Sequence, residues 1–295
     1  MVFAQKILTD FKTQVKINAS AYKFNLNPSK MSKKASPDKR RAAIGLATLV
    51  LVLLLWYVTT TATGLINPVR FPQPAEWWGS LKTIALNGYG NGKLHQHVLH
   101  SLKLVAMGFS VAIVVGIPLG LLMGYSRKAE ALINPAFLLL RPIPPLAWIP
   151  LAIVWLGLED ASKILVIFVA AFVPSVINSY TGVRNIDKPV MEAANMLGIK
   201  GWKMLWEVLI PGSMSMIFTG LRLSLQASWT TLVAAELIGA LYGLGSILNQ
   251  AAQDIYPAMI LVAMACVGVC GATTTWLLGQ LEARAMPWRV GRVAA

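Results

Sequence analysis

An uncharged and mostly apolar run decides the fold of this chain: AAIGLATLVLVLLLWYVTTTATGLI, from Ala42 to Ile66. A helix of about 20 mostly apolar residues crosses the hydrocarbon core of a bilayer, so this run is long enough to span a membrane. Three further runs have the same character, at about residues 102–125, 164–180 and 257–281. The four runs together predict a protein that crosses the membrane several times as helices.

Two less regular stretches bring the predicted number of spans to six. One covers about residues 136–158 and contains Arg141 and four prolines, and the other covers about residues 216–240 and contains Arg222, Gln226 and Glu236. Polar groups are tolerated at membrane depth only where they face protein or water. We therefore expect an all-α polytopic membrane domain over residues 42–281, in which these two stretches avoid lipid.

The net charge of +14 is distributed unevenly along the chain. Ten of the 26 lysines and arginines precede Ala42, and if both termini are cytosolic, the cytosolic segments hold 19 basic residues against four in the opposite loops. That asymmetry follows the positive-inside rule, so it predicts cytosolic termini and accounts for the basicity without nucleic acid. With 56% apolar and 13% charged residues, the composition also departs from that of soluble domains, which are about a quarter charged.

The two terminal segments are predicted to lie on the cytosolic side. Residues 1–41 show no secretory signal, and their apolar residues Phe3, Ile7 and Phe11 recur at helical spacing among lysines. This pattern is compatible with an interfacial helix on anionic lipid and equally with a flexible basic tail. Residues 282–295 form a short basic C-terminal tail. Membrane lipid is the expected contact for the first of these segments.

A long cytosolic loop, at about residues 182–215, reads as structured. Helix-forming residues run from about Val190 to Leu197, Gly198 follows as a helix-ending residue, and a second amphipathic stretch from Trp202 ends at Pro211. Glycine past a helix end takes the left-handed cap conformation, and proline stops a helix. We expect a short helix, a bend and another short helix.

The segment EAANMLGIKGWKMLWEVLIPG, from Glu192 to Gly212, carries a resemblance to a known family. It is similar to the cytoplasmic EAA loop of importer-type ABC permeases in the identity and spacing of Glu192, Ala193, Ala194, Gly198 and Pro211. The resemblance implies that these five residues form the coupling helix that ATPase subunits grip. The alternative is an amphipathic loop helix resting on lipid headgroups.

Further segments resemble one branch of that family, the permeases for taurine, alkanesulfonates, nitrate and bicarbonate. They are LRPIPPLAWIPLAIVWLG from Leu140, SKIL from Ser162, WTTLVAAELIG from Trp229 and GLG from Gly243. The resemblance implies a type I importer architecture of six transmembrane helices in a bacterial inner membrane, for a small anionic solute. It also implies a homodimer with two ABC ATPase subunits, which would bind ATP and magnesium, and a periplasmic or lipid-anchored binding protein, with no cofactor in this chain.

The third predicted span contains candidate residues of the translocation path. Its prolines remove backbone donors and distort the helix, and irregular backbone at membrane depth often lines a cavity. The candidates here are Arg141, Pro144 and Trp148, with a plain packing kink as the alternative. Arg141 could attract an anionic solute, or it could snorkel to a cytosolic interface lying only a few residues away.

The fifth predicted span has polar residues at helical spacing. Gln226, Trp229, Thr230 and Glu236 are the candidates for lining the path, and interhelical hydrogen bonding inside the bundle is the alternative. Because Glu236 would repel an anion, we expect it to act in gating or structure. In the second span, Gly116, Gly120 and Gly124 recur at intervals of four, which predicts close packing of another helix.

Nothing in the sequence predicts an active site or a metal site. His95, His97 and His100 have spacings that could ligate zinc, but no cysteine or second carboxylate joins them. The spans lack the histidine, aspartate or cysteine clusters of a membrane-embedded enzyme and the several acidic residues of an ion-driven carrier. We therefore expect a non-catalytic transport subunit, with nitrate, bicarbonate or an organic acid as alternative solutes to a sulfonate.

Overall fold

A computed structural model describes residues 39–64, 67 and 70–287 of the chain. Within these residues every regular element is helical, and the β contacts are limited to one bridge between Tyr89 and Gly92. The elements in chain order are α2 (Lys39–Tyr57), η2 (Val58–Ala62), α3 (Pro74–Leu86), α4 (Leu94–Tyr125), α5 (Arg127–Leu140), η3 (Pro145–Trp148), α6 (Ile149–Leu156), α7 (Asp160–Arg184), α8 (Lys188–Met196), α9 (Trp202–Met204), η4 (Leu205–Leu209), α10 (Ile210–Leu237), α11 (Leu244–Gln253) and α12 (Pro257–Ala285).

The first structural unit ends at Val52 and contains most of α2. Large apolar side chains of α2, such as Leu46 and Leu53, leave about half or more of their surface exposed, at 65% and 50%. An apolar helix of this length with apolar side chains on all faces is typical of a helix surrounded by lipid or by another chain. Most of the basic N-terminal segment that the sequence predicts, up to residue 38, lies outside the described residues.

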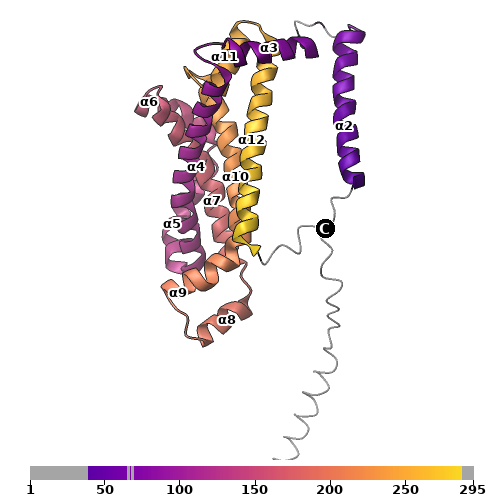
Figure 1. The fold of residues 1–295 in the computed structure, drawn as a ribbon. Coiled ribbons are helices and arrows are strands. Elements are labelled where there is room, and N and C mark those ends of the chain that lie inside the picture. The colour runs from indigo at the N-terminus through magenta and orange to yellow at the C-terminus, as the bar shows by residue number, and fades with distance from the viewer. Residues whose placement is uncertain (1–38, 65–66, 68–69, 288–295) are drawn as a thin grey trace, which may run out of the picture. The chain divides into compact units, whose positions relative to one another are not determined.

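The second unit begins at Leu53 and contains the helical bundle. At its start, the Trp56 indole donates a hydrogen bond of 3.0 Å to the carbonyl oxygen of Pro72, and its ring meets Phe71 and Trp77 edge-on. Helices α4, α7, α10 and α12 run side by side (Figure 1). Helices α3 and α11 lie at one end of this bundle and α8 lies at the other (Figure 1). These two ends are called the α11 end and the α8 end below.

Glycines bring α4 and α7 into close contact. A Cβ atom on Gly116 would lie 2.9 Å from Cβ of Ser175, one on Gly120 would lie 2.5 Å from the carbonyl oxygen of Val176, and one on Gly124 would lie 2.7 Å from Cβ of Val183. Small residues at intervals of four let two helix backbones approach, and dispersion and weak polar contacts then hold the pair. The three glycines therefore lie on the α4 face that packs against α7.

Buried hydroxyl groups join α7 to α10 on the other side of α7. The Ser224 hydroxyl donates to the carbonyl oxygen of Ala171 at 2.7 Å and shares a hydrogen bond of 2.8 Å with the Ser175 hydroxyl. One turn along, Ser228 donates to the carbonyl oxygen of Ser224. These pairings satisfy polar groups that have no water to bind at membrane depth.

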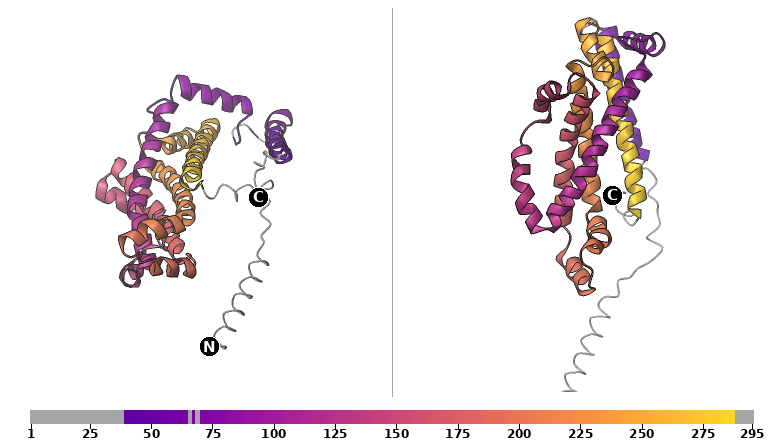
Figure 2. Two further views of the ribbon diagram at one scale, coloured as in Figure 1. Left: turned by 60° about the horizontal axis from the view of Figure 1, so that its bottom comes forward. Right: turned by 90° about the vertical axis from the view of Figure 1, so that its left-hand side faces the viewer.

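The third predicted span is broken. Helix α5 begins at Arg127 rather than at about residue 136, and the pair formed by α5 and the segment Pro145–Leu156 is bent by 82°. The right-hand view of Figure 2 shows the chain following α5 and then turning into α6. Prolines at the break lack the N–H that would continue the helix. Because α5 starts earlier, Arg141 lies 14 residues after the start of this helix, at its far end, and not a few residues from the start of a span as predicted.

The bounds of other helices also extend past the apolar runs. α4 begins at Leu94 rather than at about residue 102, α7 runs from Asp160 to Arg184, and α12 ends at Ala285. Helices of membrane proteins continue beyond the hydrocarbon core, where polar residues are no longer penalised, so hydropathy does not mark their ends. His95, His97 and His100 consequently lie on α4.

Pro211 does not end a helix as predicted. The chain is helical without a break from Trp202 to Leu237, and Pro211 stands in the first turn of α10. The wider π-helical turn Leu205–Leu209 precedes it. Proline lacks the N–H that would bond to the preceding turn, and the π turn shifts the hydrogen-bond register just before it.

In the described part of the chain, five helices are long and apolar enough to cross a membrane, or six if the bent α5–α6 pair counts as one span. The all-α polytopic architecture predicted from the sequence is confirmed.

Gly120→Leu should destabilise the bundle, because the side chain would collide with the α7 backbone at Val176. Overpacking of a tight core costs about 1–3 kcal/mol. Thermal unfolding of the purified chain in detergent measures the effect. The matched control is Gly268→Leu on α12, where a Cβ would meet nothing within 4 Å. Equal melting temperatures for the two variants would contradict the packing role of Gly120.

Candidate functional site

Helix α8 (Lys188–Met196) projects at one end of the bundle and carries the predicted coupling residues (Figure 1). The side chains of Glu192 and Ala193 are exposed, whereas Ala194 is only 5% exposed and joins the hydrophobic core. Ala193 is therefore available to a partner, and Ala194 instead fixes α8 to the rest of its own chain. The prediction that the side chains of both Ala193 and Ala194 contact a partner is therefore corrected for Ala194, which is buried.

The bend after α8 depends on Gly198. Its φ angle is +74°, its amide donates to the carbonyl oxygen of Asn195, and the amide of Ile199 donates to the carbonyl oxygen of Ala194, both at 3.0 Å. This pair of bonds with a left-handed glycine is the Schellman motif, which satisfies carbonyl groups at a helix end. The motif turns the chain back toward α9 and leaves the tip of α8 exposed.

Large apolar side chains gather at this tip. Met196 is 89% exposed and Leu197 is 78% exposed, and Trp202, at the start of the next helix, is 72% exposed. Adjacent exposed apolar side chains of this size are typical of a surface that binds protein or membrane. A groove between α4 and the Trp202–Trp206 pair is also lined almost wholly by apolar side chains. The α8 end is thus shaped for contacts beyond this chain.

The break between α5 and α6 holds the first set of predicted path residues. Arg141 caps α5, donating its amide to the carbonyl oxygen of Phe137 at 2.9 Å, while its side chain is exposed. Pro144 is exposed, and Trp148 is half-buried with an indole N–H that has no hydrogen-bond partner within the described residues. No ion pair in the described residues includes Arg141.

The predicted path residues of α10 divide between two faces of the helix. Trp229 is 5% exposed, and its indole donates to the Thr274 hydroxyl of α12 at 3.0 Å, so it packs inside the bundle and does not line a path. Ser224, Ser228 and Thr231 are buried as well. Gln226 and Thr230 lie on the exposed face, where the Thr230 hydroxyl donates to the carbonyl oxygen of Gln226 at 3.1 Å. The latter two remain candidates for a path.

Glu236 is enclosed, contrary to a path-lining role. Its carboxylate has no exposed surface and accepts hydrogen bonds from the Ser101 hydroxyl at 2.8 Å and from the amide of Gly245 at 2.7 Å. The Ser101 oxygen in turn accepts from the amide of Leu244 at 2.9 Å. A buried carboxylate is tolerated when it is hydrogen-bonded in this way. It therefore joins α4, α10 and the start of α11.

The GLG segment is needed for this enclosure. A Cβ on Gly243, whose φ is +126°, would lie 2.2 Å from a carboxylate oxygen of Glu236, and one on Gly245 would lie 2.6 Å from Cβ of Glu236. Nδ1 of His97 lies 3.1 Å from both the amide nitrogen and the carbonyl oxygen of Gly243. Only glycine leaves the space and takes the backbone conformation that bring the loop onto the carboxylate.

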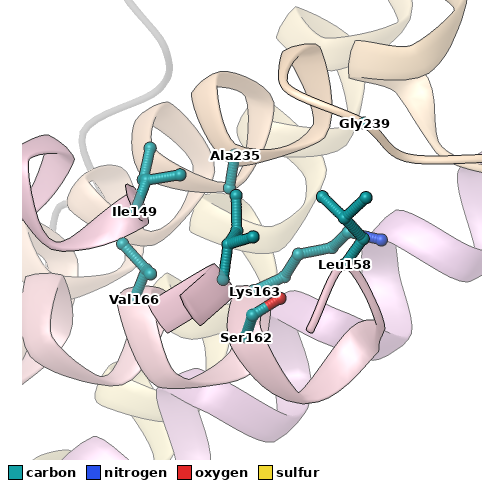
Figure 3. Close-up of a pocket in the computed structure, with 8 residues that line it drawn as sticks. Ile149, Leu158, Ser162, Lys163, Val166, Ala235 and Gly239 are labelled. Atoms are coloured by element: carbon teal, nitrogen blue, oxygen red, sulfur yellow. The ribbon is translucent and has the colours of Figure 1, made fainter. Parts of the chain in front are cut away.

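A small cavity lies beside this cluster, between α6, α7 and α10 (Figure 3). Apolar side chains and Ser162 line it, and the Lys163 side chain extends past Leu158. Its accessible volume of about 10 Å³ is the space of a single water molecule at most. Lys163 is 7% exposed, with Nζ 3.7 Å from Oδ1 of Asp160, which also lies 3.2 Å from Nε2 of His100. Asp160 and Lys163 were not singled out from the sequence, although SKIL includes Lys163.

The surface of the α11 end is held by the turn at residues 87–92. The Tyr89 hydroxyl donates to Asp254, and the Asn91 amide donates to the carbonyl oxygen of Leu241 at 3.0 Å. Burial, together with the hydrogen bond to Asp254, raises the pKa of the Tyr89 phenol, so it remains a donor across the physiological range. The turn is thus fixed to both ends of the α11 segment.

Two of the three histidines serve as packing and pairing residues in the described chain. His97 binds the Gly243 backbone and His100 pairs with Asp160, and the described residues contain no group of three metal-ligating side chains. Arg222 pairs with Glu282 of α12.

Residues 116–286 match the family described as the binding-protein-dependent transport system inner membrane component. The taurine transport system permease protein TauC of Escherichia coli strain K12 is 35% identical over 253 residues, covering 85% of this chain and 92% of TauC. The nitrate import permease protein NrtB of Synechocystis is 32% identical over 257 residues, covering 85% of this chain and 91% of that protein. Among solved structures, the inward-facing methionine ABC transporter MetNI shares the fold with a TM-score of 0.53 at 22% identity, over 68% of this chain and 96% of that chain.

These matches and the membrane-spanning fold agree with each other, and the chain therefore belongs to the binding-protein-dependent permeases, the inner-membrane subunits of ABC importers.

Proposed function

We propose that this chain and a second copy of itself form the translocation path of a bacterial importer for small solutes that carry an oxyanion group. The relatives' names give taurine and nitrate, and both solutes carry such a group, a sulfonate in taurine. Bicarbonate and organic acids are the alternative solutes for the same machinery. Two ATPase subunits would bind ATP and magnesium, and a binding protein would deliver the solute. Neither role needs a catalytic residue in this chain.

The projection of α8 is the observation that carries the coupling part of this proposal. Glu192 and Ala193 are exposed on a short helix with an exposed apolar tip, while Ala194 fixes that helix to the bundle. A helix that a partner protein binds firmly must combine an exposed contact surface with a buried attachment to its own chain. Lipid headgroups would need only the first of these two features.

Charge distribution supports the orientation. The α8 end holds Arg127, Lys128, Lys188, Lys200 and Lys203, so the positive-inside rule assigns it to the cytosol. The binding protein would then meet the α11 end, whose surface turn is fixed by Tyr89 and Asn91. ATP-driven closure of the ATPase pair would move the two α8 helices together, and the helix continuous from Trp202 would transmit that motion to α10.

Replacing Glu192 by Ala together with Gly198 by Val should abolish solute uptake and reduce copurification of the ATPase subunits. The change at Glu192 removes an exposed charge from α8, and the change at Gly198 places a β-branched residue at a φ of +74°. Membrane levels of the chain should stay within about twofold of wild type, because a Cβ at Gly198 meets nothing within 4 Å.

The matched control for that variant is Glu159→Ala with Gly157→Val. It changes a second exposed glutamate and a nearby glycine of positive φ, both just before α7 and not on α8. ATPase copurification should be normal in this control. Normal copurification and transport in the Glu192 and Gly198 variant would refute the coupling assignment.

Gln226→Leu should change uptake more than membrane insertion, because Gln226 lies on the exposed polar face of α10. Losing one neutral hydrogen bond to a solute costs about 0.5–1.5 kcal/mol, so KM for uptake should rise about 2- to 12-fold. Gln280→Leu, an exposed glutamine near the end of α12, is the control and should leave KM unchanged. Identical kinetics for the Gln226 variant and wild type would remove this face from the path.

A further inference from the structure

The contacts of α5 fix the depth of Arg141 within the bundle. The Phe137 ring meets the Phe172 ring of α7 edge-on, with centroids 6.3 Å apart. On the same stretch of α7, Ala171 and Ser175 hydrogen-bond to Ser224 of α10. Phe137, Phe172 and Ser224 therefore lie at about one level of the bundle.

Arg141 lies one helical turn beyond that level, toward the α11 end. Four residues of helix rise about 6 Å, which brings Arg141 level with Phe168 of α7 and with the stretch of α10 from Gln226 to Thr230. From Phe168 to the start of α7 at Asp160 is about 12 Å, and from Arg141 back to Arg127 is about 21 Å. An extended arginine side chain reaches roughly 7 Å, so its guanidinium does not reach the start of α7 or the start of α5.

The guanidinium at this depth needs a partner, and the described residues supply none in an ion pair. A charged side chain at the centre of a bilayer costs about 2.5–3.5 kcal/mol on insertion scales, and the negative end of α5 offsets only about 0.3–1 kcal/mol of that. The Arg141 side chain is exposed and takes part in none of the ion pairs of the described residues. Lipid is therefore an unfavourable neighbour for this side chain.

A second copy of the chain would cover Arg141 without neutralising it. Among the described residues, three carboxylates near this level already have partners: Glu236 is enclosed by Ser101 and Gly245, Asp160 pairs with Lys163 and His100, and Glu130 pairs with Arg184 at the α8 end. Glu159 is exposed, but it precedes α7 and lies about 13 Å along that helix from Phe168. Two copies would consequently bring two guanidinium groups, and no described carboxylate, to one level of the bundle.

We propose that Arg141 is the oxyanion contact of the translocation path. The inference rests on the proposed function and names the group of the solute that is recognised within the membrane. A planar guanidinium presents paired N–H donors that match two oxygens of a sulfonate or nitrate group. The α5–α6 break places this donor at the end of a helix, where the following residues Pro142–Pro144 are exposed and leave it accessible. Gln226 and Thr230 supply exposed neutral polar groups at the same level.

The first test measures uptake by the complete importer, with ATPase subunits and binding protein, in proteoliposomes supplied with taurine or nitrate. Arg141→Gln should raise KM about 10- to 160-fold, the value of a charged hydrogen bond. Arg141→Lys keeps the charge and should recover part of that loss. Arg127→Gln, the same substitution at the other end of α5, is the control and should leave KM unchanged.

The possible results separate this proposal from the proposed function. An Arg141→Gln importer that keeps its ATPase subunits and its wild-type KM overturns the role of Arg141 and leaves the permease assignment intact. The same holds if Arg141→Lys loses as much affinity as Arg141→Gln. A wild-type importer that accumulates neither taurine nor nitrate, nor another oxyanion solute, overturns both.

A second test does not depend on the activity of a variant. In a background in which Cys266 and Cys270 are replaced by alanine, Arg141→Cys should react with a water-soluble, sulfonate-bearing thiol reagent applied to proteoliposomes. Leu139→Cys is the control, because Leu139 is 79% exposed on the same helix and faces about 160° away. Labelling of Leu139→Cys without labelling of Arg141→Cys shows that Arg141 faces lipid and overturns the proposal.

Discussion

Water is absent from the hydrocarbon core of a bilayer, so every polar group between the two ends of this bundle has to find its partner within protein. Most of them do. Ser224 binds the α7 backbone, Trp229 donates to Thr274, and Glu236 accepts from Ser101 and Gly245. These hydrogen bonds satisfy polar side chains that would be unfavourable in an apolar span without a partner. Among the described residues, Arg141 is exposed and takes part in no ion pair, so its position calls for a functional explanation.

The fold was largely predictable because hydropathy reports which residues avoid water, and each predicted apolar run overlaps a helix of the structure. What hydropathy does not report is where a helix leaves the hydrocarbon core. Residues 127–135 of α5 mix basic, acidic and apolar side chains, so no apolar run marks its beginning, and the depth of Arg141 was misjudged as a result. Depth became apparent only through tertiary contacts, of which the Phe137–Phe172 pair is the most direct.

The candidate sites were predictable to different degrees for a similar reason. The identity and spacing of Glu192, Ala193 and Gly198 point to an exposed helix and a cap, both of which depend on local sequence. The division of α10 into a buried and an exposed face depends on which helices flank it. Trp229 and Thr230 are neighbours in sequence, yet one packs against α12 and the other is exposed, and only the positions of α7 and α12 decide between them. The enclosure of Glu236 likewise requires α4 and the loop at Gly243, which are far apart in the chain.

The two ends of α10 differ in how firmly the structure holds them. At the α8 end, a π-helical turn and Pro211 interrupt the regular hydrogen-bond ladder, so this is the part of the helix that bends most easily. At the α11 end, Glu236 ties the helix to α4 and α11 through two hydrogen bonds in a buried site. A push on α8, of the kind that the proposed coupling requires, would therefore be absorbed partly at Leu205–Leu209 and otherwise rotate α10 about its end at Glu236. Gln226 and Thr230 lie between the π turn and Glu236, at the level of Arg141. A rotation of α10 would therefore change which of its side chains face the proposed path at the level where Arg141 would bind an anion.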